Sequence, residues 1–223
     1  MIRKNKNLVK LFLFLSAAVL IVLIIFIVLS VRKKDGRFDV PIFSGQLHWG
    51  VGEEEILNLL DSPPTDEIQE DSSKILHVNG NFDTPFGECS AVQLYISTTK
   101  LEDDKPLGLY AAALTLSHLN GESLEDAVVR HYGEVSWDSG NSSPEMSFYY
   151  PEASRFSSLS DEQWGKIVSY YELGQKQNNQ PDYQLQYRLD KMHDNDYYVL
   201  IRFREPDYIF INALPLAVLE RME

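Results

Sequence analysis

The feature that most constrains this chain is an apolar run from Leu11 to Val31, LFLFLSAAVLIVLIIFIVLSV, in which Ser16 and Ser30 are the polar residues. A helix rises 1.5 Å per residue, so this run reaches about 30 Å, the thickness of the hydrocarbon core of a bilayer. The alternative is a cleaved signal peptide, whose apolar region of about 7–15 residues ends at a small-x-small site. Here the small pair, Ala17-Ala18, lies in the middle of the run. The sequence therefore predicts an uncleaved, single-pass transmembrane helix over Leu11–Val31 that contacts the lipid bilayer.

Basic residues flank this segment on both sides and do not decide its orientation. They are Arg3, Lys4, Lys6 and Lys10 before the run, and Arg32, Lys33, Lys34 and Arg37 after it. Lys and Arg near the cytoplasmic end normally set the orientation. The layout itself, a short tail and an early apolar segment before a large domain, is typical of a signal anchor. We expect a cell-membrane protein with its N-terminus in the cytoplasm and its C-terminal domain outside; the alternative is a cytoplasmic domain.

Charge separates the two parts of the chain. The net charge of the whole chain is −13, but the residues after Lys34 hold 13 of the 20 Lys and Arg and all 33 Asp and Glu, a net charge of −20. Binding to a phosphate backbone needs a basic surface, so we expect no nucleic-acid partner. A disulfide scaffold is excluded because Cys89 is the single cysteine. With 44% hydrophobic and 12% aromatic residues, the acidic part can bury a core.

These observations divide the chain into four predicted segments. They are a basic tail (1–10), the transmembrane helix (11–31), a juxtamembrane stalk (32–43) and an acidic extracytoplasmic domain (44–223). The stalk is assigned because the stretch is short and contains Gly36 and Pro41. The last segment has the size of a single domain, or of two small subdomains that share one core.

Two short helices are predicted in the acidic domain. The first follows Gly52, has Glu53–Glu55 at its positive dipole end, and stops at Pro63-Pro64. The second begins at a capping box made by Ser123 and Asp126 and closes at Gly133. Each helix carries an apolar stripe that is expected to face a core.

The remaining patterns favour strands. Tyr183–Asp190 alternates apolar and polar residues, Val199–Phe203 continues this beyond a turn at His193–Asp196, and Tyr208–Ala213 follows. Earlier candidates are Lys74–Val78, Ala91–Ser97, Leu109–Leu119 and Lys166–Leu173. The predicted fold class after the transmembrane helix is therefore α+β: an antiparallel sheet with short helices packed on one face.

The segment Leu47–Pro63, LHWGVGEEEILNLLDSP, resembles a pattern of bacterial envelope proteins, although Gly52 and Asp61 stand where that pattern has a Ser or Thr and a Gly. The pattern belongs to the helix-then-strands unit of the barrel-assembly accessory lipoproteins, and the β-lactamase inhibitor proteins use a similar unit twice. The helix that ends at His131-Tyr132-Gly133 could open a second unit here. The resemblance implies a binding or assembly scaffold in which no catalytic residues carry over.

Motifs for chemistry are absent from the sequence. The five histidines form no H-x-x-x-H pair, none lies near Cys89, and there is no G-x-S-x-G, S-x-x-K or phosphate loop. The residues Asp190, Asp194, Asn195 and Asp196 could suit calcium, but Asp and Asn in a turn bind local backbone without an ion. Cys89 is expected to be a small buried hydrophobe. We expect no enzyme activity, no catalytic residue, no metal and no cofactor.

Adjacent tyrosines are the one pattern that points to binding. The pairs are Tyr149-Tyr150, Tyr170-Tyr171 and Tyr197-Tyr198, and on predicted strands each pair places one ring on each face. Tyr150, Tyr171 and Tyr198 are the candidates for contacting a protein or cell-wall partner, while cross-strand packing explains such pairs equally well. The predicted function is a noncatalytic binding or assembly module of a bacterial cell envelope. The alternative is a cell-surface hydrolase that acts on wall glycan through a carboxylate pair.

Overall fold

The computed structural model describes residues 38–119, 123–137, 146–178 and 183–222. The chain divides into two units, Met1–Gly36 and Arg37–Glu223. The basic tail and the predicted transmembrane helix Leu11–Val31 lie outside the described residues. None of the helices within the described ranges is long and apolar enough to cross a membrane.

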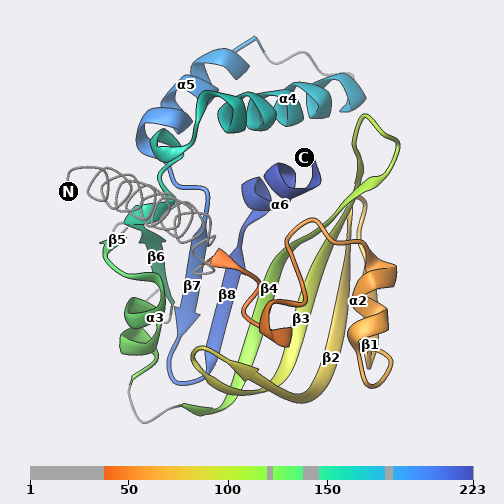
Figure 1. Ribbon diagram of the computed structural model, residues 1–223, viewed down its shortest axis with the longest axis vertical. Coiled ribbons are helices and arrows are strands. Elements are labelled where there is room, and N and C mark those ends of the chain that lie inside the picture. The colour runs from red at the N-terminus through yellow and green to blue at the C-terminus, as the bar shows by residue number, and fades with distance from the viewer. Residues whose placement is uncertain (1–37, 120–122, 138–145, 179–182, 223) are drawn as a thin grey trace, which may run out of the picture. The chain divides into compact units, whose positions relative to one another are not determined.

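The second unit is built around one antiparallel sheet (Figure 1). Its eight described strands are β1 (Asp66–Gln69), β2 (Ser73–Thr84), β3 (Gly87–Lys100), β4 (Pro106–Leu119), β5 (Val135–Trp137), β6 (Ser147–Pro151), β7 (Leu200–Arg204) and β8 (Tyr208–Asn212). They are ordered β1-β2-β3-β4-β8-β7-β6-β5, so β4 and β8 meet in the middle. The prediction of an α+β fold with an antiparallel sheet is confirmed.

One helix precedes each half of the sheet in the chain, and further helices lie beyond the ends of the strands. The described α-helices are α2 (Glu53–Leu59), α3 (Leu124–Tyr132), α4 (Asp161–Asn178), α5 (Leu185–Asn195) and α6 (Leu214–Arg221); the 3-10 turns are η2 (Phe43–Gly45), η3 (Glu152–Ser154) and η4 (Phe156–Ser158). Helix α2 comes before β1–β4 and α3 before β5–β8, with α4 and α5 between β6 and β7. Figure 1 shows α4 and α5 beyond the ends of the strands, with α6 between them and the sheet.

Local chemistry explains why α2 and α3 form where they were predicted. Gly52 is the N-cap of α2, and three glutamates occupy its first turn. In α3 the Ser123 hydroxyl accepts a hydrogen bond from the Asp126 amide at 3.1 Å. The Glu205 carboxylate, from the turn between β7 and β8, accepts a second bond from the Leu124 amide at 3.0 Å. This hydrogen bond joins the start of α3 to the turn between β7 and β8, 81 positions further along the chain.

The core lies on one face of the sheet. The helices contribute Ile56, Val128 and Val218 to it, and the central strands contribute fully buried residues such as Leu94, Leu114 and Ile209. Val40 and Ile42, which the sequence assigns to the stalk, are 3% and 0% exposed and belong to this core. The domain therefore begins before residue 44, because the chain ahead of η2 packs against the sheet instead of extending away.

Two strand predictions are wrong. Lys166–Leu173 lies in α4, and Tyr183–Asp190 falls largely within α5. Leu185 and Leu189 are four residues apart and share a helix face, and Leu189 is 2% exposed while Tyr187 is 59% exposed. The apparent two-residue alternation came from a helical stripe. The predicted turn at His193–Asp196 is consequently the end of α5.

Candidate functional site

Strands β6, β7 and β8 have one set of side chains that faces the core and a second set that faces away from it. Neighbours along a strand point to opposite faces. Tyr149, Ile201 and Ile211 are core residues, so Tyr150, Leu200 and Asn212 lie on the outer face of the sheet. This outer face is where the candidate site begins.

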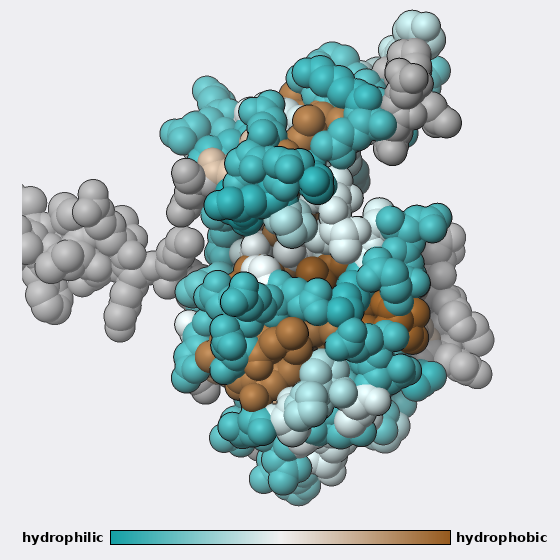
Figure 2. All heavy atoms as spheres, turned by 90° about the vertical axis from the view of Figure 1, so that its right-hand side faces the viewer, coloured by the Kyte–Doolittle hydropathy of each residue, from teal (hydrophilic) through white to brown (hydrophobic). Residues whose placement is uncertain are grey.

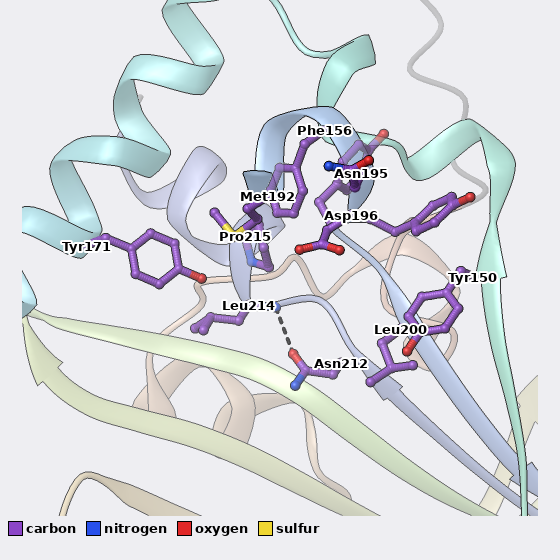
Figure 3. Close-up of a pocket in the computed structure, with 12 residues that line it drawn as sticks. Tyr150, Phe156, Tyr171, Met192, Asn195, Asp196, Leu200, Asn212, Leu214 and Pro215 are labelled. Carbon is purple, nitrogen blue, oxygen red and sulfur yellow. Dashed lines mark hydrogen bonds between the residues drawn. The ribbon is translucent and has the colours of Figure 1, made fainter. Parts of the chain in front are cut away.

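A pocket of about 450 Å³ opens at that position, which is within the usual size range of ligand sites (Figure 3). Its walls come from the outer face of β6–β8, from η4, from α4, from the end of α5 and from the start of α6. The lining residues are Tyr150, Phe156, Tyr171, Met192, Asn195, Asp196, Tyr197, Tyr198, Leu200, Asn212, Leu214 and Pro215. Aromatic and aliphatic side chains therefore surround a small number of polar groups.

All three tyrosines that the sequence singles out line this pocket. Only Tyr150 is on a strand; Tyr171 is on α4, and Tyr198 lies between α5 and β7. The expected row of rings on one sheet face is thus replaced by rings that converge from a strand, a helix and the segment between α5 and β7. Figure 3 shows the Tyr171 hydroxyl pointing into the pocket from α4. The role of these residues in binding a partner stays a prediction.

A charged pair holds the aromatic wall in place. The Arg155 guanidinium donates to the Glu152 carboxylate from Nε at 2.7 Å and from a second nitrogen at 3.0 Å. The Tyr197 hydroxyl donates to the same carboxylate at 3.1 Å, and Arg155 lies 4.7 Å above the centre of the Tyr197 ring. The ring of Tyr150 packs on Tyr197 with a centroid distance of 5.3 Å. The hydrogen bonds from Arg155 lower the pKa of Glu152, so this group stays charged.

Tyr198 forms a wall of the pocket through its ring rather than its hydroxyl. The hydroxyl donates to the Ala153 carbonyl at 3.1 Å, and the Tyr198 amide donates to the Ser154 carbonyl at 2.8 Å. Its ring meets the edge of Phe156 at 6.0 Å. These contacts fix the ring against η3 and η4, so the hydroxyl is occupied within the fold.

Asp196, which the sequence analysis weighed for calcium and assigned to a turn, lines the pocket. It ends α5, where its amide donates to the Met192 carbonyl at 2.9 Å and its carbonyl accepts from the Phe156 amide at 3.1 Å. Its carboxylate makes no hydrogen bond or ion pair with any residue that the structure describes, and Figure 3 shows it directed into the pocket. Partial burial raises the pKa of Asp196. The sequence placed this residue in a hairpin turn, whereas it is the C-cap of α5, so no signal in the sequence pointed to a pocket.

The outer face continues beyond the pocket as a surface of rings and arginines. The Arg202 guanidinium lies 5.2 Å from the centre of Phe148 and 5.5 Å from that of Phe210, and the Tyr95 ring meets Phe210 at 5.4 Å. The Arg202 Nε atom is buried and has no hydrogen-bond partner among the described residues. Arg202 follows the pocket residue Leu200 by two positions on β7, so the two side chains share the face.

The other residues weighed in the sequence have structural roles. Cys89 is fully buried, its thiol donates to the Ala91 carbonyl at 3.0 Å, and burial raises its pKa, which confirms a small buried hydrophobe. Asp190 accepts a bond from Gln186 on α5. Within the described ranges no group of three His, Cys, Asp or Glu side chains could hold a metal ion.

Apolar residues also reach the surface away from the pocket. Figure 2 views the side of the molecule that carries α2 and shows brown apolar patches among teal hydrophilic residues. Leu57 of α2 and Ile68 of β1 are 37% and 42% exposed. Neither residue lines the aromatic pocket.

Comparison of the chain with protein-family models, with curated proteins and with solved structures finds no match.

Proposed function

We propose that this protein is a noncatalytic binding module of a bacterial cell envelope, anchored in the cell membrane by Leu11–Val31 with its acidic domain outside. The observation that carries the proposal is the aromatic pocket. It gathers Tyr150, Tyr171 and Tyr198 around a carboxylate that no described residue neutralises. Rigid rings around a few polar groups are the usual composition of a recognition site.

The order of the elements supports a scaffold made of two helix-plus-strands units. One unit is α2 with β1–β4 and the other is α3 with β5–β8, and they join through the β4–β8 pair. This order agrees with the resemblance of Leu47–Pro63 to envelope proteins that use such units. Joining the units edge to edge extends the outer face across the sheet, which suits contact with a large partner.

The alternative function, glycan hydrolysis, is less well supported. That chemistry needs two carboxylates about 5–9.5 Å apart that face each other across the substrate. Among the described residues that line the pocket, Asp196 is the only carboxylate. Glu152 lies behind the wall and is engaged by Arg155 and Tyr197. A pocket with one carboxylate favours binding over cleavage.

A crosslinked pulldown of the full-length, membrane-anchored protein tests the proposal. We expect a specific partner whose recovery falls about tenfold or more with Tyr171→Ala or Tyr150→Ala, because aromatic anchors dominate binding energy. Tyr187→Ala is the matched control, since Tyr187 is 59% exposed on α5 and outside the pocket. Equal recovery with all three variants would contradict the proposal, as would release of sugar from cell-wall glycan by the purified full-length protein.

The membrane orientation has a separate test. A reporter that is active only outside the cytoplasm, fused after Glu223, is expected to work. Activity confined to a cytoplasmic reporter at the same position would place the acidic domain inside and overturn this part of the proposal.

A further inference from the structure

Asp196 is an exposed residue at the pocket whose carboxylate has no counter-charge among the described residues. Its side chain forms no hydrogen bond or ion pair with the described residues, and burial alone accounts for the raised pKa. An unpaired pocket carboxylate leaves a negative charge that a bound cation can pair with. Two cations on neighbouring elements are directed elsewhere: Arg155 bonds to Glu152, and the Arg202 guanidinium lies over the rings of Phe148 and Phe210. Burial raises the pKa of Tyr171; the nearby charge of Arg188 on α5 opposes this shift, and the charge of Asp196 adds to it.

The walls around this carboxylate suit an organic cation. Met192, Leu214 and Pro215 provide apolar surface for an alkyl stem. Tyr150 and Tyr171 add aromatic groups to the lining, and aromatic rings attract ammonium and guanidinium groups. Figure 3 shows the Asp196 carboxylate with Tyr171, Met192 and Pro215 on one side and Tyr150 on the other.

We infer that the pocket binds a positively charged group carried on an alkyl stem, with Asp196 as its counter-ion and the pocket tyrosines as its cage. This inference rests on the proposed binding function and names the ligand chemistry of the same site. The favoured source is a lysine or arginine side chain of a polypeptide partner, because the pocket opens onto the broad outer face of the sheet. The net charge of −20 beyond Lys34 also attracts basic partners over a distance. A free amine offers the same chemistry from a second source.

Calorimetric titration of the full-length protein in detergent micelles with short lysine peptides tests the inference. The probes are Gly-Gly-Lys-Gly-Gly with blocked ends, the same peptide acetylated at Nζ, and n-butylamine. We expect the lysine peptide to bind at least about tenfold more tightly than the acetylated one, because acetylation removes the charge and its interactions. This comparison uses the wild-type protein, so it does not depend on the folding of a variant. Equal binding of both peptides, or binding of neither, would overturn the inference.

Variants then locate the site. Asp196→Asn keeps the size of the side chain, and we expect it to weaken binding of the lysine peptide about tenfold or more. Glu54→Gln removes one charge from an exposed position on α2, outside the pocket, and is expected to leave binding unchanged. Equal losses in both variants would mean that general charge attracts the peptide, which contradicts a built site. Butylamine that binds as tightly as the peptide would identify a free amine as the source and support the same chemistry.

The proposed function and this inference fail in different ways. If no cationic probe binds but recovery of the crosslinked partner still depends on Tyr150 and Tyr171, the binding module stands and the cation is wrong. If the cationic peptide binds through Asp196 but no partner is recovered, the ligand chemistry stands and the assignment to a protein partner is wrong.

Discussion

Asp196, the counter-ion of the proposed cation site, is exposed but partly desolvated, so its charge links the site to stability. Its folded-state pKa lies above the ordinary 3.8 because burial disfavours the charged form. The charge therefore destabilises the protein at neutral pH, and this cost disappears as the pH falls through the raised pKa. We expect Asp196→Asn to have an equal or higher Tm at pH 7, with the difference shrinking on acidification. Calorimetric scans between pH 7 and pH 3 check this, and a clearly lower Tm at pH 7 would mean that the carboxylate supports the fold.

The pKa of Glu152 is shifted in the opposite direction, and its charge therefore stabilises the fold. Its pKa is below the ordinary 4.5 because Arg155, and then Tyr197, donate hydrogen bonds to its charged form. Such a group stabilises the folded state above its unfolded-state pKa, and the contribution is lost as the pH falls through the lowered value. We expect Glu152→Gln to lower the Tm at pH 7 and to match the wild type below the lowered pKa. The same pH series of scans checks this, and an unchanged Tm at pH 7 would show that the Arg155–Glu152–Tyr197 contacts do not stabilise the domain.

At the scale of elements, the start of β4 depends on a glycine. Gly108 has a φ of +88°, and a Cβ there would lie 2.3 Å from the Val51 carbonyl oxygen. The backbone of residues 50 and 51 runs against β4 at this point, with the Leu109 amide donating to the Val51 carbonyl at 2.9 Å. We expect Gly108→Ala to lower the free energy of unfolding by about 2–4 kcal/mol, because both the φ angle and the contact must change. Chemical denaturation measures this.

Gly165 provides the matched control on α4. It lies in the interior of the helix, and a Cβ built there meets no atom within 4 Å. We expect Gly165→Ala to raise the free energy of unfolding by about 0.5–1 kcal/mol, because alanine favours the helix and has less freedom when unfolded. If the two alanine substitutions change the free energy of unfolding in opposite directions, the loss at Gly108 comes from its backbone conformation. A loss at Gly165 as large as that at Gly108 would contradict this account.

The elements also show what the sequence could and could not predict. Helices α2 and α3 were predictable because their caps, charges and stop residues are local in sequence. Helices α4 and α5 were missed because their tyrosines favour strands. The start of α4 does carry a local signal, a capping box in which Ser160 and Gln163 bond to each other's amides, whereas the N-cap of α5, Gln184, makes no side-chain capping bond. Tertiary packing of Leu189 and Ile167 decides these two helices.

At the scale of the whole molecule, the sequence predicted some residues of the candidate site but not how they come together. Tyrosines 150, 171 and 198 stood out as members of pairs, but their convergence depends on where α4 and α5 pack. Asp196 became a pocket residue only because α5 ends at Asn195 and points the next residue beneath η4. No local sequence pattern encodes how four elements pack against one another. The sequence therefore predicted the type of residue at the site but not the geometry of the site.

The boundary of the domain yields the last prediction. The first of the two units of the chain ends at Gly36. Soon after it, Val40 and Ile42 are buried in the core, and the Trp49 indole donates to the Phe38 carbonyl at 2.6 Å. A protein that starts at residue 37 should therefore keep its cooperative unfolding transition. One that starts at residue 44 should lose about 3–5 kcal/mol, because two fully buried aliphatic side chains and this hydrogen bond are removed. Urea unfolding of the two truncated proteins measures the difference. Equal stability would return residues 38–43 to the role of a stalk and place the start of the folded domain at residue 44.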